Sequence, residues 1–278
     1  MDRGYALLDH GGGARLERFA AHVTDRPHAG ALAARHDPEA WRAADLRFDR
    51  DRGWNGEPAS LEPWPIELDG VTMELRPTEA GQVGLFPEHA AMLPWLRERL
   101  ATRAGEAPPA ILHLFAYTGL STLALAASGG SVVHLDASRP TIAWARHNAE
   151  LAGFAERPIR WIVDDALAFT EREARRGRRY AGVVLDPPTY GHGPGARPWR
   201  LEDDLVRLLA ACAAVLEPDG FVLLTAHTPG FGADRLASTL GAAIGRGPAG
   251  VESGELSLVA VDGGRLELGA FARSSGGA

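Results

Sequence analysis

From Pro108 onward, short runs rich in β-branched and aliphatic residues alternate with amphipathic stretches of helical length. This alternation is typical of a doubly wound α/β sheet, because each helix returns the chain so that the next strand can run parallel to the last. A hairpin that turns at Asp262–Gly264 ends the pattern. We therefore expect a Rossmann-like, mostly parallel sheet with one antiparallel strand in a C-terminal hairpin. The predicted strands cover residues 110–116, 131–137, 159–165, 180–188 and 221–227, with helices beginning near Ser121, Arg139, Leu167 and Leu201 and a last helix over 232–245.

Residues 1–104 have a different texture, with short apolar segments separated by Gly, Pro and charged residues. Tyr5–Asp9 and Glu67–Leu75 have the alternation of strands, and Glu88–Arg103 has the spacing of a helix. The sequence therefore predicts a small N-terminal α+β region over 1–104, with a linking helix, and a Rossmann-like domain over 105–278.

Composition excludes several classes of protein. Cys212 is the only cysteine, which excludes a disulfide scaffold and a cysteine-built zinc or iron–sulfur site. The sequence has no lysine, so Schiff-base chemistry and a Walker-type phosphate loop are excluded as well. The net charge of -7 argues against a protein that coats nucleic acid non-specifically. The ten histidines are scattered without metal-ligand spacing, so no metal is expected.

The hydropathy pattern predicts a cytoplasmic protein. No apolar run approaches the length that spans a bilayer, and the first residues lack the apolar core of a secretory signal. We therefore expect no contact with a membrane.

Polar residues follow the predicted strands at the sheet edge where such folds bind ligands. Gly119 follows the first strand and would allow a backbone turn close to a ligand, although an ordinary tight turn has the same signature. Asp136 ends the second strand, where a carboxylate can accept hydrogen bonds from ribose hydroxyls or cap the next helix. Asp164 and Asp165 end the third strand, where one can face an adenine amine and the other can cap a helix.

The fourth strand ends in the most specific motif, D-P-P-T-Y over Asp186–Tyr190. The prolines fix φ and cannot donate a backbone N–H, so the Asp186 carboxylate and the loop carbonyls can be directed outward as acceptors. Tyr190 adds an aromatic face on which a base can stack. This combination suits a planar substrate that carries an amine or a ring N–H.

With these motifs in place, the chain resembles a class I S-adenosylmethionine-dependent methyltransferase. Residues 113–153 together with LDPPTYGHGP are similar to the family that contains bacterial large-subunit ribosomal RNA cytosine-C5 and guanine methyltransferases. The resemblance covers about 75–230 and includes GQVGLFPE over Gly81–Glu88. It implies S-adenosylmethionine as cofactor and a catalytic site at Asp186, Pro187, Pro188 and Tyr190. The cofactor contacts that it implies are Phe86, Phe115, Tyr117, Thr118, Gly119, Asp136, Ala137, Asp164, Asp165, Ala166 and Asp186.

The acceptor atom is predicted to be nitrogen rather than cytosine C5, because C5 methylation needs a thiolate that adds to the ring. Cys212 lies within an apolar helical stretch, and the end of the fifth strand, Thr225–Thr228, has no cysteine. We expect ribosomal RNA as the substrate, although acidic residues outnumber arginines in 1–104 and form no basic platform there. Protein partners are not predicted. The expected substrate contacts are Tyr190, His192, Arg197, Trp199 and Arg200, in a loop that could equally be a lid over the cofactor.

Two other functions share part of this pattern. One is a methyltransferase of a small molecule or protein, which the acidic surface favours. The other is a nucleotide-binding module or a nicotinamide-dependent oxidoreductase, which would use the same glycine turn and Asp136. The D-P-P-T-Y motif argues against this second group, because neither a hydride transfer nor simple binding needs it.

Overall fold

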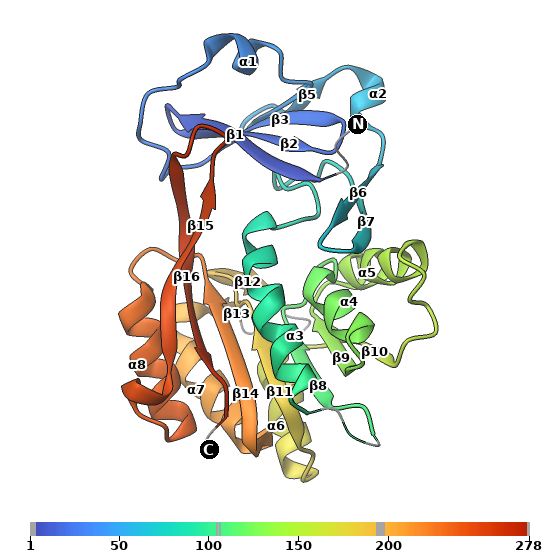
Figure 1. Ribbon diagram of the computed structural model, residues 1–278, viewed down its shortest axis with the longest axis vertical. Coiled ribbons are helices and arrows are strands. Elements are labelled where there is room, and N and C mark those ends of the chain that lie inside the picture. The colour runs from blue at the N-terminus through green and yellow to red at the C-terminus, as the bar shows by residue number, and fades with distance from the viewer. Residues whose placement is uncertain (1–3, 104, 106, 193–197, 277–278) are drawn as a thin grey trace. The chain divides into compact units, whose positions relative to one another are not determined.

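The computed structural model describes residues 4–103, 105, 107–192 and 198–276 (Figure 1). The chain divides into two compact units. The N-terminal unit comprises Met1–Ala91 together with Ser257–Leu268, and the C-terminal unit comprises Met92–Leu256 together with Gly269–Ala278. The chain therefore returns from the second unit to the first before it ends.

The C-terminal unit is built on a seven-stranded sheet in the order β10-β9-β8-β11-β14-β16-β15. The first five strands run parallel, and β16 pairs antiparallel with β14. This confirms the predicted Rossmann-like sheet and its C-terminal hairpin. Strand order reverses between β8 and β11, which is the place where open α/β sheets bind ligands. The strands are β8 Ala110–Leu114, β9 Ser131–Asp136, β10 Ile159–Val163, β11 Tyr180–Leu185, β14 Leu216–Ala226, β15 Glu252–Val259 and β16 Arg265–Ser274.

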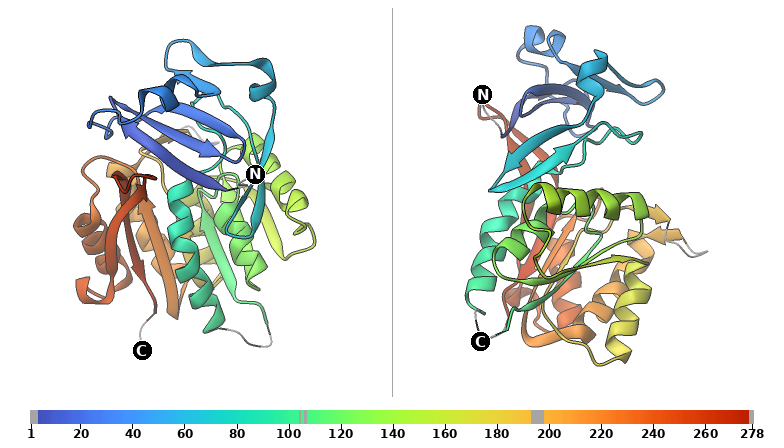
Figure 2. Two further views of the ribbon diagram at one scale, coloured as in Figure 1. Left: turned by 45° about the horizontal axis from the view of Figure 1, so that its top comes forward. Right: turned by 90° about the vertical axis from the view of Figure 1, so that its right-hand side faces the viewer.

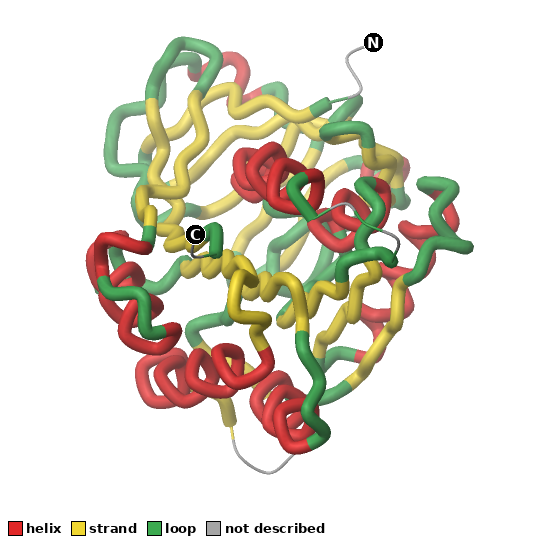
Figure 3. The backbone as a smooth tube through the Cα atoms, turned by 60° about the horizontal axis from the view of Figure 1, so that its bottom comes forward, coloured by secondary structure: helices red, strands yellow, loops and turns green. Residues whose placement is uncertain are grey.

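Helices cover both faces of this sheet, with α3, α4 and α5 on one face and α6, α7 and α8 on the other (Figures 2 and 3). Local capping explains where several of them begin: Ser138 accepts from the N–H of Thr141 at the start of α5, and Asp165 accepts from Ala168 at the start of α6. The helices are α3 Leu93–Ala101, α4 Leu120–Ala127, α5 Arg139–Leu151, α6 Ala166–Arg175, α7 Leu201–Val215 and α8 Ala233–Ile244, with a short 3-10 helix η2 at Pro248–Gly250.

The single helix predicted over Glu88–Arg103 is two elements in the structure. A 3-10 helix η1 covers Pro87–Met92, and α3 begins at Leu93. Pro94 lies at the start of α3 and has no backbone N–H to donate to the preceding turn, so an α-helix cannot continue through it.

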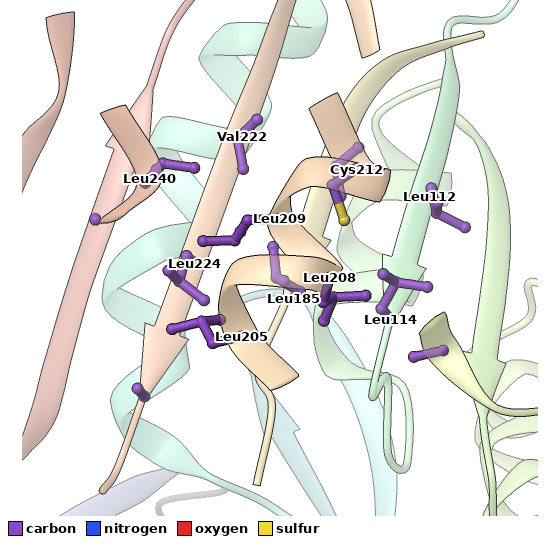
Figure 4. Close-up of a cluster of buried hydrophobic side chains, with 14 of the residues drawn as sticks. Leu112, Leu114, Leu185, Leu205, Leu208, Leu209, Cys212, Val222, Leu224 and Leu240 are labelled. Carbon is purple, nitrogen blue, oxygen red and sulfur yellow. The ribbon is translucent and has the colours of Figure 1, made fainter. Parts of the chain in front are cut away.

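The main core lies between the sheet and α7, as Figure 4 shows. Leucines of α7 pack against β8, β11 and β14, and Cys212 lies among them with 1% exposure. On the same sheet, a Cβ atom at Gly182 would lie 2.2 Å from the ring of Phe221, so only glycine fits beside that ring. Burial of its twelve leucines and three valines at roughly 1.5–3 kcal/mol each makes this cluster a large source of the unit's stability.

The described part of the N-terminal unit is mostly β structure, with two short α-helices and most of η1, so the α+β expectation holds in a weaker form. A five-stranded sheet runs in chain order and a separate hairpin follows it. Its core also takes Ala260 and Leu266 from the C-terminal hairpin, which pack with Leu7 and Ala31. The elements are β1 Tyr5–Gly11, β2 Ala14–Phe19, β3 His22–Pro27, α1 Pro38–Arg42, β4 Leu46–Asp49, β5 Gly53–Gly56, α2 Pro58–Leu61, β6 Trp64–Leu68 and β7 Val71–Leu75.

Candidate active site

The turn after β8, here called the β8 turn (Phe115–Gly119), has an unusual backbone. Phe115 and Tyr117 have φ of 54° and 49°, and Gly119 has φ of 101°. A side chain at such an angle costs roughly 1–2 kcal/mol, so the surrounding structure must hold the turn in place. The Ala116 N–H donates to the Leu135 carbonyl at 3.0 Å, and the Asn148 amide donates to the Thr118 carbonyl at 2.9 Å. Strain of this kind, fixed by neighbours, is typical of a functional site.

Asp136, at the end of β9, is tied to the β8 turn. Its Oδ2 accepts from the Tyr117 N–H at 3.0 Å and its Oδ1 from the Ser138 N–H at 2.9 Å. Ser138 provides the cap of α5, so Asp136 is not needed for that role. Burial raises the pKa of the Asp136 carboxyl group. Each carboxylate oxygen can accept a second hydrogen bond, so the geometry leaves room for two ligand hydroxyl groups.

The two acids after β10 have separate structural partners. Asp165 caps α6 by accepting from the Ala168 N–H at 2.8 Å. Asp164 accepts from the Asp165 N–H at 2.8 Å and forms an ion pair with Arg172. The sequence left open which acid caps the helix, and the structure assigns the cap to Asp165. The contact of Asp165 with adenine stays a prediction. One oxygen of this carboxylate already accepts the Ala168 N–H.

The remaining predicted cofactor residues lie at three places. Ala137 follows β9 directly, and Ala166 is the first residue of α6 and is buried. Phe86 belongs to the N-terminal unit, where its ring centroid lies 5.9 Å from that of His89. Its contact with the cofactor remains a prediction.

The loop after β11, here called the β11 loop (Asp186–Thr189), is held by side chains from the end of β14. The Thr225 hydroxyl donates to Asp186 Oδ1 at 2.6 Å, and His227 Nε2 lies 3.4 Å from the same oxygen. Thr189 and Thr228 join their hydroxyl groups at 2.7 Å. Sequence reasoning allowed His227 to approach the site and otherwise noted Thr225–Thr228 for its lack of cysteine, but nothing local indicates that Thr225 and Thr228 reach the D-P-P-T motif.

Trp199 is buried, whereas a residue that stacks on a base would be exposed. Its indole is 7% exposed, donates to the Pro188 carbonyl at 2.7 Å, and packs on Phe115 with ring centroids 5.2 Å apart. The indole therefore braces the β11 loop against the β8 turn instead of offering an open face to a base. It lies on β13 (Pro198–Arg200), which pairs with β12 (Tyr190–His192), and its indole packs in the main core cluster.

The other expected substrate residues lie around this ribbon. The Tyr190 ring is 67% exposed, and the Arg200 guanidinium lies 5.5 Å from its centroid. The backbone of His192 pairs with Pro198. Arg197 lies outside the described residues. An exposed aromatic ring beside a guanidinium is an arrangement that can stack on a base and pair a phosphate.

Cys212 cannot act as a nucleophile in this structure. It lies in the α7 core, and burial raises the pKa of its thiol to about 12. A thiolate is therefore scarce near neutral pH.

Comparison with known proteins agrees with this geometry. A model of the S-adenosylmethionine-dependent methyltransferases matches residues 15–244. The chain belongs to this family. A solved S-adenosylmethionine-dependent methyltransferase from Agrobacterium tumefaciens is 35% identical, covers 98% of this chain and 90% of its own, and has a TM-score of 0.91. The structure of SMU.776 complexed with S-adenosylhomocysteine shares the fold at 14% identity, with a TM-score of 0.74 over 98% of this chain and 75% of its own.

A curated relative is the ribosomal RNA large subunit methyltransferase K/L of Magnetococcus marinus, which is 30% identical over 169 residues. The match covers 60% of this chain and 22% of the relative, so the chain spans about a fifth of that protein's length.

The protein is thus an S-adenosylmethionine-dependent methyltransferase, and the inert binding module and the oxidoreductase are set aside. The residues fit the cofactor, since Asp136 holds a fixed carboxylate of the kind that accepts from ribose hydroxyls, beside the β8 turn. Among the described residues, no helix is long and apolar enough to cross a membrane.

Proposed function

We propose that this enzyme methylates a base nitrogen of ribosomal RNA. The observation that carries this proposal is the β11 loop, where a fixed Asp186 carboxylate precedes two prolines and an exposed Tyr190 ring. The relationship to a protein named as a large-subunit ribosomal RNA methyltransferase supports RNA as the substrate class. Such a substrate implies a cytoplasmic enzyme.

The loop offers two acceptors to the N–H groups of an amine. Trp199 already donates to the Pro188 carbonyl, so the Asp186 carboxylate and the Pro187 carbonyl are the pair proposed to bind the substrate. Two acceptors on two N–H groups fix the plane of the amine and leave its lone pair directed toward the methyl donor. When bound, S-adenosylmethionine supplies a methyl group already activated on a sulfonium sulfur.

A nitrogen acceptor is favoured over cytosine C5 because the chain offers no thiolate. Its one cysteine is buried in the core, and its thiol pKa is raised to about 12. A nitrogen lone pair attacks the methyl group directly, so no covalent adduct is needed.

Tyr190 and Arg200 are the proposed RNA contacts, together with His192 and Arg197. The Tyr190 ring would stack on the target base or its neighbour, and the arginines would pair phosphates. Trp199 is proposed to act indirectly, by holding the loop in place.

The test uses methyl-labelled S-adenosylmethionine and total RNA from a strain that lacks the gene. Labelled RNA is digested and its nucleosides are identified by mass spectrometry. We expect a methylated guanosine or adenosine that disappears with Asp186→Ala and persists with Cys212→Ser.

Two results would contradict the proposal. A 5-methylcytidine product would overturn the nitrogen acceptor. An absence of label in RNA, with S-adenosylhomocysteine binding intact, would overturn RNA as the substrate and favour a small molecule or protein.

A further inference from the structure

The segment Thr225–Thr228, at the end of β14, contacts the β11 loop at both of its ends. Thr225 and His227 face Asp186 at the start of the loop, and Thr228 bonds to Thr189 at its end. No local sequence motif joins these two segments. These contacts indicate that Thr225–Thr228 holds the β11 loop in its conformation.

The strand register explains these contacts. Leu185 of β11 pairs with Leu224 of β14, so Asp186 and Thr225 are the next residues along two parallel neighbours. Side chains at matching positions of paired strands lie on the same face, and so do residues two apart along one strand. Thr225 therefore reaches the Asp186 carboxylate, and His227, which directly follows the last residue of β14, also lies beside it.

The Thr225 hydroxyl and the His227 imidazole approach the same oxygen of Asp186. The Thr225 hydroxyl donates to Oδ1 at 2.6 Å, and His227 Nε2 is 3.4 Å from it. The Thr225 hydrogen bond holds the carboxylate, and a held carboxylate can meet an amine with little reorganisation.

We propose that His227, with Nε2 unprotonated at the start of the reaction, takes up the proton released by the substrate by way of Asp186. This rests on the proposed nitrogen acceptor. As the nitrogen–carbon bond forms, the carbon–sulfur bond breaks and its electron pair neutralises the sulfonium. The nitrogen then loses a proton to the Asp186 carboxylate, and the proton passes to the His227 imidazole and on to water.

Basicity and exposure fit this direction of transfer. An imidazole is ordinarily a stronger base than a carboxylate, which favours this direction of transfer. The side chains of His227 and Asp186 are 28% and 20% exposed, so the imidazole can release a proton to solvent. The proton therefore has a route out of the site after each methyl transfer.

The test compares variants of the full-length enzyme on total RNA from the deletion strain, with kcat, KM and S-adenosylhomocysteine affinity measured. His227→Gln keeps an N–H donor but cannot take up a proton, and His227→Ala keeps neither. We expect kcat to fall about tenfold to a hundredfold in both, with cofactor affinity unchanged. Added imidazole should restore part of the activity of His227→Ala only.

Two matched variants separate positioning from proton uptake. Thr225→Val should lower kcat and Thr225→Ser should restore it, because only the hydroxyl group holds Asp186 Oδ1. His147→Ala, on the exposed face of α5, should keep full activity.

Three outcomes overturn the inference. Full kcat in His227→Gln and His227→Ala would show that His227 has no part in the reaction. Full kcat in His227→Gln alone would leave only positioning and would refute proton uptake. Activity lost with EDTA and restored by a divalent cation would show that Asp186 and His227 hold a metal instead. A wild-type enzyme that labels no RNA overturns the proposed function itself and is recognised before any variant is compared.

Discussion

The β8 turn and the β11 loop follow neighbouring strands, yet they are fixed by different means. The β8 turn is shaped by its backbone, with left-handed φ angles at Phe115, Tyr117 and Gly119 and a backbone N–H held by Asp136. The β11 loop is shaped by two prolines and by side chains from β13 and β14. Cofactor binding at the β8 turn should therefore be sensitive to a side chain added at Gly119. Methyl transfer at the β11 loop should be sensitive to the loss of single functional groups.

The largest expected effect is a difference in cofactor affinity between variants of the two carboxylates, Asp136 and Asp186. Asp136→Ala removes the anchor of the Tyr117 N–H and the proposed ribose acceptor, so we expect S-adenosylhomocysteine affinity to fall about a hundredfold, since hydrogen bonds to charged groups contribute about 1.5–3 kcal/mol each. Asp186→Ala should leave that affinity within about threefold while abolishing methyl transfer. Calorimetric titration of both variants makes the comparison. Equal losses of affinity in the two variants would mean that the β8 turn and the β11 loop both contribute to cofactor binding.

A smaller loss is expected at Gly119. With φ at 101°, valine there is strained by about 1–3 kcal/mol, and its Cβ would lie 3.5 Å from that of Ala145. Gly119→Val should weaken S-adenosylhomocysteine binding about tenfold or more. The matched control is Gly153→Val, which has φ of 75° with nothing within 4 Å and should cost stability without affecting the cofactor. Unchanged affinity in Gly119→Val would show that the β8 turn does not depend on its glycine.

Trp199→Phe tests the brace between the two sides. Phenylalanine keeps a ring against Phe115 but removes the N–H that bonds to the Pro188 carbonyl. We expect kcat to fall a few-fold to about tenfold, because the loop loses a hydrogen bond that contributes about 0.5–1.5 kcal/mol. Cofactor affinity should stay the same. Steady-state kinetics with a direct binding measurement would show whether the effect reaches the β8 turn instead.

The smallest expected effect is on the free energy of unfolding at acid pH, through the buried His134. His134 is fully buried, bonds through Nδ1 to Thr122 at 2.8 Å, and its Nε2 has no hydrogen-bond partner among the described residues. Burial and the neighbouring His113 lower the pKa of His134 well below its ordinary value. The unfolded chain therefore binds a proton near pH 6.5 that the folded protein does not, and the free energy of unfolding should fall as the pH drops below that value.

Urea unfolding between pH 7.5 and 5.5 measures this dependence. We expect a slope of up to about 1.4 kcal/mol per pH unit from this one group, with no contribution above pH 7.5. His134→Gln should have a smaller slope. An identical slope in the variant would assign the acid sensitivity to other histidines.

Much of the fold could be predicted because it is encoded locally. The strand runs, the spacing of the helices and the acids at strand ends are all visible in a few consecutive residues, and so is the Asp186–Tyr190 motif. Their structural partners were not visible. Thr225 and His227 meet Asp186 only because β14 lies beside β11 in one register, which no local pattern records.

Two further differences have the same origin. Trp199 stands among Gly, Pro and Arg and so has the pattern of an exposed loop residue, but its indole packs in the main core cluster. The apolar spacing over Glu88–Arg103 correctly predicts helical structure. Pro94 divides it into the 3-10 helix η1 and the α-helix α3. Apolar patterns predict which face is buried, and backbone hydrogen bonding decides where an element begins.

The hairpin that ends the sheet sets an order for biosynthesis. Its tip, Ser257–Leu268, belongs to the N-terminal unit, where Ala260 and Leu266 pack with Leu7 and where the Val261 N–H donates to the Leu7 carbonyl at 3.0 Å. Between Leu7 and Leu266 the chain contains β8, β9, β10, β11 and β14. This part of the N-terminal core therefore cannot be completed until those five strands have been synthesised.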